Sequence, residues 1–126
     1  MKPNFFDMTV HDVDKAREFF GNVFDWSFEK LESSDRYYLI KAGPDSEDGI
    51  NGGIGVVGGA RIAEGRPLTQ VTIPVADLET FIEKVKKNGG YVLETKIAIP
   101  GVGWYATCAE PSGLIFGILQ SDPKAA

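Results

Sequence analysis

Two segments of the chain alternate apolar and polar residues with the period of a β-strand and then change to the spacing of an amphipathic helix. Residues 5–10, FFDMTV, and residues 70–75, QVTIPV, each carry a uniformly apolar set and a mixed set on opposite faces. The uniformly apolar set should lie beneath the helix that follows, and the mixed set should face away from it. The apolar sets are Phe6 and Met8 in the first segment and Val71 and Ile73 in the second.

These segments belong to an internal repeat with a constant offset of 65 residues. Asp12 aligns with Asp77 directly before the two helical patterns. Each carboxylate is predicted to cap its helix by accepting a hydrogen bond from an unpaired backbone amide. The helices are predicted to end at Gly21-Asn22 and at Asn88-Gly89-Gly90, because glycine and asparagine favour the left-handed conformation that ends a helix.

Three further strands complete each half. The same offset places the segment from Trp26 over the segment from Tyr91, and Glu29 over Glu94, at the start of the next strand. After these come RYYLIKA, which corresponds to GWYATCA, and NGGIGVV, which corresponds to LIFGILQ. All four are predicted strands. Their ranges are 36–42, 103–109, 51–57 and 114–120.

The sequence therefore predicts an α+β fold of two tandem βαβββ modules within a single domain, residues 1–126. The first module covers residues 4–58, a glycine-bearing linker covers 59–68, the second module covers 69–120, and a short tail covers 121–126. One helix covers only one face of the sheet in a half of about 60 residues. The two modules should therefore complete each other as a cupped sheet of mixed and antiparallel strands.

Composition and charge exclude several classes of function. The chain of 126 residues is 43% hydrophobic and 25% charged, and its net charge of −5 disfavours nucleic acid as a partner. No segment approaches the ~20 apolar residues of a membrane span, and no basic-then-apolar leader opens the chain. The single cysteine, Cys108, excludes an internal disulfide, and its apolar surroundings favour an inert buried thiol over a nucleophile. We expect a cytoplasmic protein that binds neither nucleic acid nor a membrane.

The chain resembles the vicinal oxygen chelate superfamily, whose members include glyoxalases, bleomycin resistance proteins and dioxygenases. The resemblance covers almost the whole chain and is most specific in the two strand-to-helix segments and in three further motifs. Two of these motifs, GINGG at 49–53 and PGVGWYATCAEPSG at 100–113, are similar to a subgroup described as predicted enzymes related to lactoylglutathione lyase. The third is KNGGYV at 87–92.

The resemblance also indicates where a metal would be held. In metal-dependent members, His, Glu or Gln side chains on the first and last strands of each module bind one divalent ion. The matching first-strand positions are Phe5 and Gln70, and the matching last-strand positions are 53–55 and Gly117. Only Gln70 offers a donor atom, whereas a catalytic metal needs about three protein ligands. The single histidine, His11, lies at a strand-to-helix corner. We therefore expect no metal and no other cofactor.

Gly117 interrupts the apolar strand that follows the turn Pro111-Ser112-Gly113. Glycine weakens a strand, so it indicates a bulge, a close approach by another group, or the loss of a side chain that related proteins have. The resemblance favours the last explanation, because relatives with metal chemistry would carry a carboxylate at this position. The glycine then leaves room for another group.

The face that carries these positions still has the components of a small-molecule site, which are a few polar groups among aromatic residues. Gln70 is either an amide that orients a ligand or a remnant of a metal site, and Asp7 is either a site residue or a half-exposed strand carboxylate. We expect Gln70 and Trp104 to line the same cavity, with Tyr105 as the substitute if its strand presents the opposite face. The predicted ligand-binding residues are Phe5, Asp7, Asn51, Gln70, Thr72, Trp104, Tyr105 and Gly117.

Three functions are compatible with these residues. The first is a metal-free enzyme or binding protein that holds a small organic molecule between the modules. The second is a metal-dependent lyase or dioxygenase of the same superfamily with a rearranged site, and the third is a drug-sequestering protein of the bleomycin-resistance kind. The fold alone does not choose between them. Because relatives commonly close their open sheet edges as two-fold dimers, we also expect a homodimer.

Overall fold

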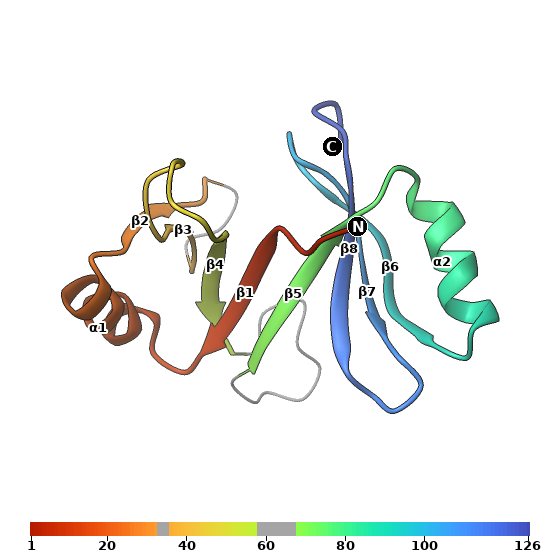
Figure 1. The fold of residues 1–126 in the computed structure, drawn as a ribbon, viewed down its shortest axis with the longest axis horizontal. Coiled ribbons are helices and arrows are strands. Elements are labelled where there is room, and N and C mark those ends of the chain that lie inside the picture. The colour runs from red at the N-terminus through yellow and green to blue at the C-terminus, as the bar shows by residue number, and fades with distance from the viewer. Residues whose placement is uncertain (33–35, 58–67) are drawn as a thin grey trace. The chain divides into compact units, whose positions relative to one another are not determined.

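The computed structural model describes residues 1–32, 36–57 and 68–126. The described residues form an α+β fold with eight strands and two helices, in the order strand, helix and three strands, twice over (Figure 1). The chain divides into two compact units, residues 5–69 and residues 70–126 together with 1–4, which we call module 1 and module 2. The predicted linker lies outside the described residues except for Leu68, where a strand already begins.

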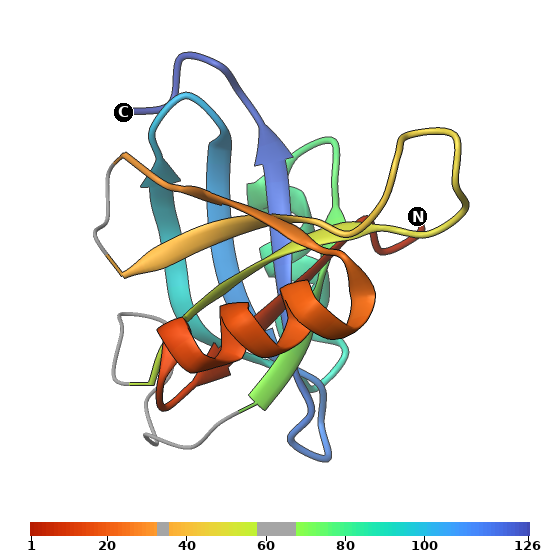
Figure 2. The ribbon, with the colours of Figure 1, turned by 90° about the vertical axis from the view of Figure 1, so that its left-hand side faces the viewer.

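Module 1 is a four-stranded sheet with one helix against it. In the sheet the strands lie in the order β2-β3-β4-β1; β1 and β4 run parallel, and the other neighbours run antiparallel. Figure 2 shows the helix lying across the strands of its own module. The elements are β1 (Phe5–Val10), α1 (Val13–Phe24), β2 (Ser27–Lys30), β3 (Tyr37–Lys41) and β4 (Asn51–Val56).

Module 2 repeats this topology. Its strands lie in the order β5-β8-β7-β6, with β5 and β8 parallel and the other neighbours antiparallel. The predicted βαβββ order is therefore confirmed in both modules. The elements are β5 (Leu68–Pro74), α2 (Leu78–Lys87), β6 (Tyr91–Ile99), β7 (Gly103–Ala109) and β8 (Ile115–Ser121).

Both predicted helix starts are confirmed. The Asp12 carboxylate accepts a hydrogen bond from the backbone amide of Lys15 at 3.0 Å, and the Asp77 carboxylate accepts one from the amide of Thr80 at 3.1 Å. Each side chain therefore satisfies an amide that has no partner inside its helix. No helix of the described chain is long and apolar enough to cross a membrane.

Only one of the two predicted helix ends is correct. The second helix ends at Lys87, and Gly89 follows with a φ of +83°. The first helix continues past Gly21-Asn22 to Phe24, and Asp25 takes the left-handed conformation with a φ of +60°. Aromatic packing explains the extra residues, because Phe24 lies with its ring centroid 6.0 Å from that of Trp26.

The helix-facing side of module 1 is apolar, as the alternation predicts. Val13 of α1 packs with Ile40 and Ile54, each of which is buried. Phe6 and Met8 of β1 pack against this cluster, so their predicted position beneath the helix is confirmed.

The corresponding core of module 2 is built around α2. Leu78 and Ile82 of the helix are buried with Cys108 and Ile118, and Ile73 of β5 packs against them as predicted. Burial raises the pKa of the Cys108 thiol, which favours the inert thiol over the nucleophile.

Val71 does not join this core. The cluster gathers toward the end of β5, at Ile73 and at the buried Val75 that follows the strand, and Val71 is 37% exposed. The prediction that Val71 lies beneath the helix is therefore wrong, although the strand does turn its Ile73 face toward the helix.

The turn between β7 and β8 is held by one carboxylate. Glu110 accepts hydrogen bonds from the backbone amides of Ser112 at 2.9 Å and Leu114 at 3.0 Å, and from the Ser112 hydroxyl. Gly113 has a φ of +108°, which the turn requires and which other residues rarely adopt. The bonds from Ser112 to the carboxylate, more than any other cause, lower the pKa of Glu110 below its ordinary value.

This turn makes a prediction about acid stability. Because the pKa of folded Glu110 is lowered, its contribution to stability should be complete above the pKa of about 4.5 of an unperturbed glutamate and should be lost as the pH falls below it. Glu110→Gln should therefore lower the thermal midpoint at pH 7, and the gap between variant and wild type should close toward pH 3. Circular dichroism melts between pH 3 and pH 7 measure this gap. A gap that is constant with pH would contradict the assignment.

Candidate functional site

Each sheet has one face against its helix and an opposite face, which we call the open face of that module. Paired residues share a face, so the strand registers define these surfaces. In module 1, one row of paired residues crosses the open face from β2 to β1, and in module 2 the equivalent row crosses from β6 to β5. The rows are Glu29, Leu39, Gly53 and Asp7 in module 1, and Glu94, Thr107, Gly117 and Thr72 in module 2.

A tyrosine lies over the glycine in the row of module 1. A Cβ atom built on Gly53 would overlap the hydroxyl of Tyr37, which reaches across from β3. The Tyr37 hydroxyl donates a hydrogen bond of 2.9 Å to the Asp7 carboxylate on β1. The phenol therefore links three neighbouring strands, and only glycine at position 53 permits it.

Module 2 contains the same arrangement with a different partner. A Cβ atom on Gly117 would overlap the hydroxyl of Tyr105, which comes from β7. The Gln70 amide on β5 donates a hydrogen bond of 3.1 Å from Nε2 to this hydroxyl. Gly117 therefore leaves room for another group, as the sequence indicates, and that group is the tyrosine ring.

This repeated contact corrects the alignment of the last two strands. The sequence comparison places Tyr37 over Trp104 and Gly53 over Phe116. In the structure Tyr37 occupies the position in module 1 that Tyr105 occupies in module 2, and Gly53 is likewise equivalent to Gly117. Each predicted correspondence is therefore shifted by one residue. The error arises because the loops before these strands differ in length.

Most of the predicted residues lie on the open face of their own module. Asp7, Gln70 and Thr72 are buried with exposed fractions of 5%, 4% and 3%, so the alternative of a half-exposed strand carboxylate at Asp7 is wrong. Tyr105 and Gly117 share the open face of module 2 with Gln70.

Trp104 does not lie with Gln70. It packs against the core beneath α2, and its indole Nε1 donates a hydrogen bond of 3.0 Å to the Asp122 carboxylate. The expectation that Trp104 and Gln70 line one cavity is therefore wrong, and Tyr105 is the residue of this strand that contacts Gln70. Both faces of this strand are apolar enough to be buried, so the alternation did not decide which one turns toward the helix.

A cavity of about 350 Å³ opens on module 1 near the start of β1. Phe5 and Leu39 supply apolar surface, while Lys41 and Asp45 supply opposite charges. Asn51 also lines it, and its side-chain oxygen accepts a hydrogen bond of 2.9 Å from the Ala42 amide. The remaining lining residues are Ser27, Phe28, Glu29, Ile40 and Gly52.

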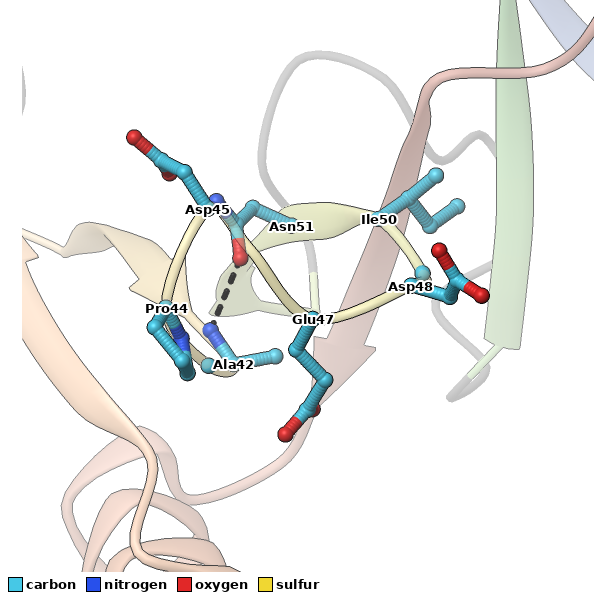
Figure 3. A pocket seen from close by; sticks show the side chains of 9 residues that line it. Ala42, Pro44, Asp45, Glu47, Asp48, Ile50 and Asn51 are labelled. Carbon is cyan, nitrogen blue, oxygen red and sulfur yellow. Dashed lines mark hydrogen bonds between the residues drawn. The ribbon is translucent and has the colours of Figure 1, made fainter.

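A smaller hollow of about 150 Å³ lies within the loop before β4 (Figure 3). Three acidic residues line it, but their carboxylates point in different directions from the loop. They do not converge on a point that a cation could occupy. These residues are Asp45, Glu47 and Asp48.

The residues present do not fit a catalytic divalent ion. Above Gly53 and Gly117, where a ligating side chain would start, the space is filled by phenol rings. Phe5 has no donor atom, so at most the Gln70 Oε1 atom remains as a ligand among the four matching positions. Within residues 1–32, 36–57 and 68–126, no three His, Cys, Asp or Glu side chains come close enough together to bind one ion. What the faces offer instead are hydroxyl, amide and carboxylate groups for hydrogen bonding to an organic molecule.

Two residues that the sequence analysis did not single out belong to the open face of module 2. Glu94 and Thr107 are a cross-strand pair, and each has a buried oxygen without a hydrogen-bond partner in the described structure. The alignment of Glu29 with Glu94 was the available signal, since it places a glutamate at the same strand position in both modules.

No family model and no curated protein matches the chain significantly. Solved structures match its fold. A glyoxalase/bleomycin resistance protein/dioxygenase superfamily member from Vibrio splendidus 12B01 matches with a TM-score of 0.65 and 13% identity, over 93% of this chain and 97% of that one. Methylmalonyl-CoA epimerase from Mycobacterium tuberculosis matches with a TM-score of 0.65 and 16% identity, over 96% and 88%. NAD-dependent benzaldehyde dehydrogenase from Legionella pneumophila matches with a TM-score of 0.67 and 15% identity, over 95% and 100%.

At these identities the likeness shows the fold and not the reaction. The names of the matching proteins describe unlike activities, so the site has to decide the function. The chain has the glyoxalase-like α+β fold of these solved structures.

The contact between Tyr105 and Gly117 predicts a strongly context-dependent substitution. Gly117→Ala should destabilise the protein by about 1–3 kcal/mol, because the new methyl group displaces the buried phenol. In a Tyr105→Ala background the same change should have little further effect, so the two substitutions should be far from additive. Gly21→Ala in α1 is the matched control, since its Cβ meets only ordinary contacts and should not destabilise. Urea unfolding measures all four variants; additive effects would rule out the contact.

Proposed function

We propose that this protein binds a small organic molecule against the open faces of its modules, without a catalytic metal. The observation that carries the proposal is the phenol over the glycine in both modules. At the last-strand positions where metal-dependent members of the resembled superfamily bind their ion, this chain has a tyrosine hydroxyl instead. These hydroxyls are hydrogen-bonded to Asp7 in module 1 and to Gln70 in module 2. These groups can recognise polar atoms of an organic ligand.

A cavity elsewhere on module 1 also supports a binding role. Small-molecule sites combine apolar surface with a few polar groups that fix orientation. The cavity of module 1 has this composition, with Phe5 and Leu39 beside Lys41. Its volume of about 350 Å³ falls within the range of ~300–1,000 Å³ that is typical of such sites.

The two alternatives from the sequence are less well supported. A metal-dependent lyase or dioxygenase with a rearranged site needs a convergent donor set, which the described residues do not supply. A drug-sequestering protein is a special case of the proposed binding role, and it differs only in leaving its ligand unchanged.

We also propose that the protein forms a homodimer. Helix α1 presents Phe19, Val23 and Phe24 to solvent with exposed fractions of 55–56%. Large apolar side chains gathered on one helix commonly mark an interaction surface.

A ligand screen with metal-depleted protein tests the binding role. Protein treated with EDTA and protein supplied with Zn²⁺, Ni²⁺ or Fe²⁺ should gain the same thermal stabilisation from a small organic ligand. A ligand at ~100 times its Kd should add ~2.7 kcal/mol to the free energy of unfolding. Tyr37→Phe or Tyr105→Phe should weaken binding of a ligand at the affected face by about 0.5–1.5 kcal/mol. Stabilisation that appears only after metal is added would overturn the proposal.

Light scattering tests the assembly. The proposed dimer should have twice the 13.7 kDa mass of the chain, and Phe19→Asp should shift it toward the monomer because it places a charge in an apolar contact. A monomer mass for the wild type at millimolar concentration would exclude the dimer.

A further inference from the structure

Three buried polar atoms without a hydrogen-bond partner lie on the open face of module 2. They are Gln70 Oε1, Thr107 Oγ1 and Glu94 Oε1, and they come from three neighbouring elements of the sheet, β5, β7 and β6. Gln70 is 4% exposed and Thr107 is 1% exposed. A buried polar group without a partner is costly, so three on one face indicate that a partner is expected there.

These atoms belong to one patch. Thr107 is paired directly with Glu94 across the β6–β7 ladder, and such pairs bring their Cβ atoms within about 4.5–5.5 Å of each other. On its other side Thr107 pairs with Gly117, over which the Tyr105 ring lies. The Tyr105 hydroxyl in turn meets Gln70. A continuous line of polar groups therefore runs from Glu94 to Gln70.

The negative charge of this patch comes from the Glu94 carboxylate. No cation of the described chain pairs with its carboxylate. The nearest lysine along β6, Lys96, bonds to Glu79 at 3.2 Å and lies over the Trp104 ring at 5.4 Å, on the helix side of the sheet. Gln70 donates from Nε2 to the Tyr105 hydroxyl, and its unpartnered atom, Oε1, can only accept a hydrogen bond. The missing partner is therefore a hydrogen-bond donor, and a positively charged donor fits best.

We propose that the open face of module 2 recognises a protonated amine on the ligand. The ammonium group donates to Glu94 Oε1 and to Thr107 Oγ1, and a polar group farther along the ligand bonds to Gln70. This inference rests on the proposed binding function and names its ligand class as organic amines. Anionic ligands of comparable size should bind poorly, because they would place like charge against the half-buried Glu94 carboxylate.

Matched pairs of simple probes test the charge preference. Phenethylamine and 3-phenylpropionate have the same aromatic end but opposite charges at neutral pH, and tryptamine and indole-3-propionate form a second pair. Each is titrated into ¹⁵N-labelled protein and followed by amide chemical shifts. The amines should give saturable shifts at Glu94 and Thr107, and the acids should not shift these amides.

Variants separate the named groups from the general charge of the protein. Glu94→Gln should weaken amine binding at least tenfold. Glu83→Gln, a matched change on the exposed side of α2, should leave amine binding unchanged. Thr107→Val should weaken amine binding to a smaller extent than Glu94→Gln, because it removes a neutral acceptor while the charge remains.

The ligand-free protein gives a second measurement. Each variant removes an unfavourable buried group: Glu94→Gln removes the charge on a carboxylate with an unpartnered oxygen, and Thr107→Val removes an unpartnered hydroxyl. Each should raise the thermal midpoint by about 2–4 °C, whereas Glu83→Gln should not. A fall in the midpoint of both variants would show that these oxygens have partners, and the inference would be wrong.

The outcomes distinguish this inference from the proposed function. Acids that bind as well as amines at this face, or amine binding unaffected by Glu94→Gln, would overturn the amine assignment while leaving a small-molecule binder. Amines that change the amide chemical shifts of module 1 residues only would also overturn the amine assignment and leave a small-molecule binder. If neither these probes nor the ligand screen bind at all, the proposed function fails together with the inference.

Discussion

Each module depends on one contact, in which a tyrosine phenol lies over a glycine of the neighbouring strand. Tyr37 over Gly53 and Tyr105 over Gly117 each connect the third, fourth and first strands of their module on the face that no helix covers. The tyrosine hydroxyl is hydrogen-bonded to a side chain of the first strand, so the contact fixes the position of the hydroxyl as well as that of the ring. The two modules then differ in chemistry, because one hydroxyl meets a carboxylate and the other an amide.

This difference gives the two open faces separate characters. In module 1 the carboxylate of Asp7 has the phenol as a partner, and the cavity nearby combines apolar surface with both signs of charge. In module 2 the polar line from Gln70 to Glu94 retains oxygens without partners. The two halves of the repeat can therefore present two unlike surfaces, because the shared contact of tyrosine and glycine tolerates different side chains around it.

Local patterns predicted the features that depend on few neighbours. The caps at Asp12 and Asp77, the order of elements and the outward direction of Gln70 follow from residues close together in sequence. Features that depend on partners across the sheet did not follow. The alternation could not decide which face of the strand holding Trp104 turns toward the helix, since the side chains on both faces can be buried. It also gave no reason to expect that Thr107 would lie between a glycine and a glutamate, because strand pairing decides this.

The phenol over the glycine also restricts how this chain could change in evolution. A histidine or glutamate introduced at position 117 would meet the ring of Tyr105 before it could reach a ligand. The tyrosine would have to be replaced first, and that step alone removes the hydrogen bond to Gln70. A metal-ligating side chain at this position therefore requires at least two substitutions in the module, through an intermediate with a cavity in a buried face. Lineages with this pair of residues should keep or lose both together.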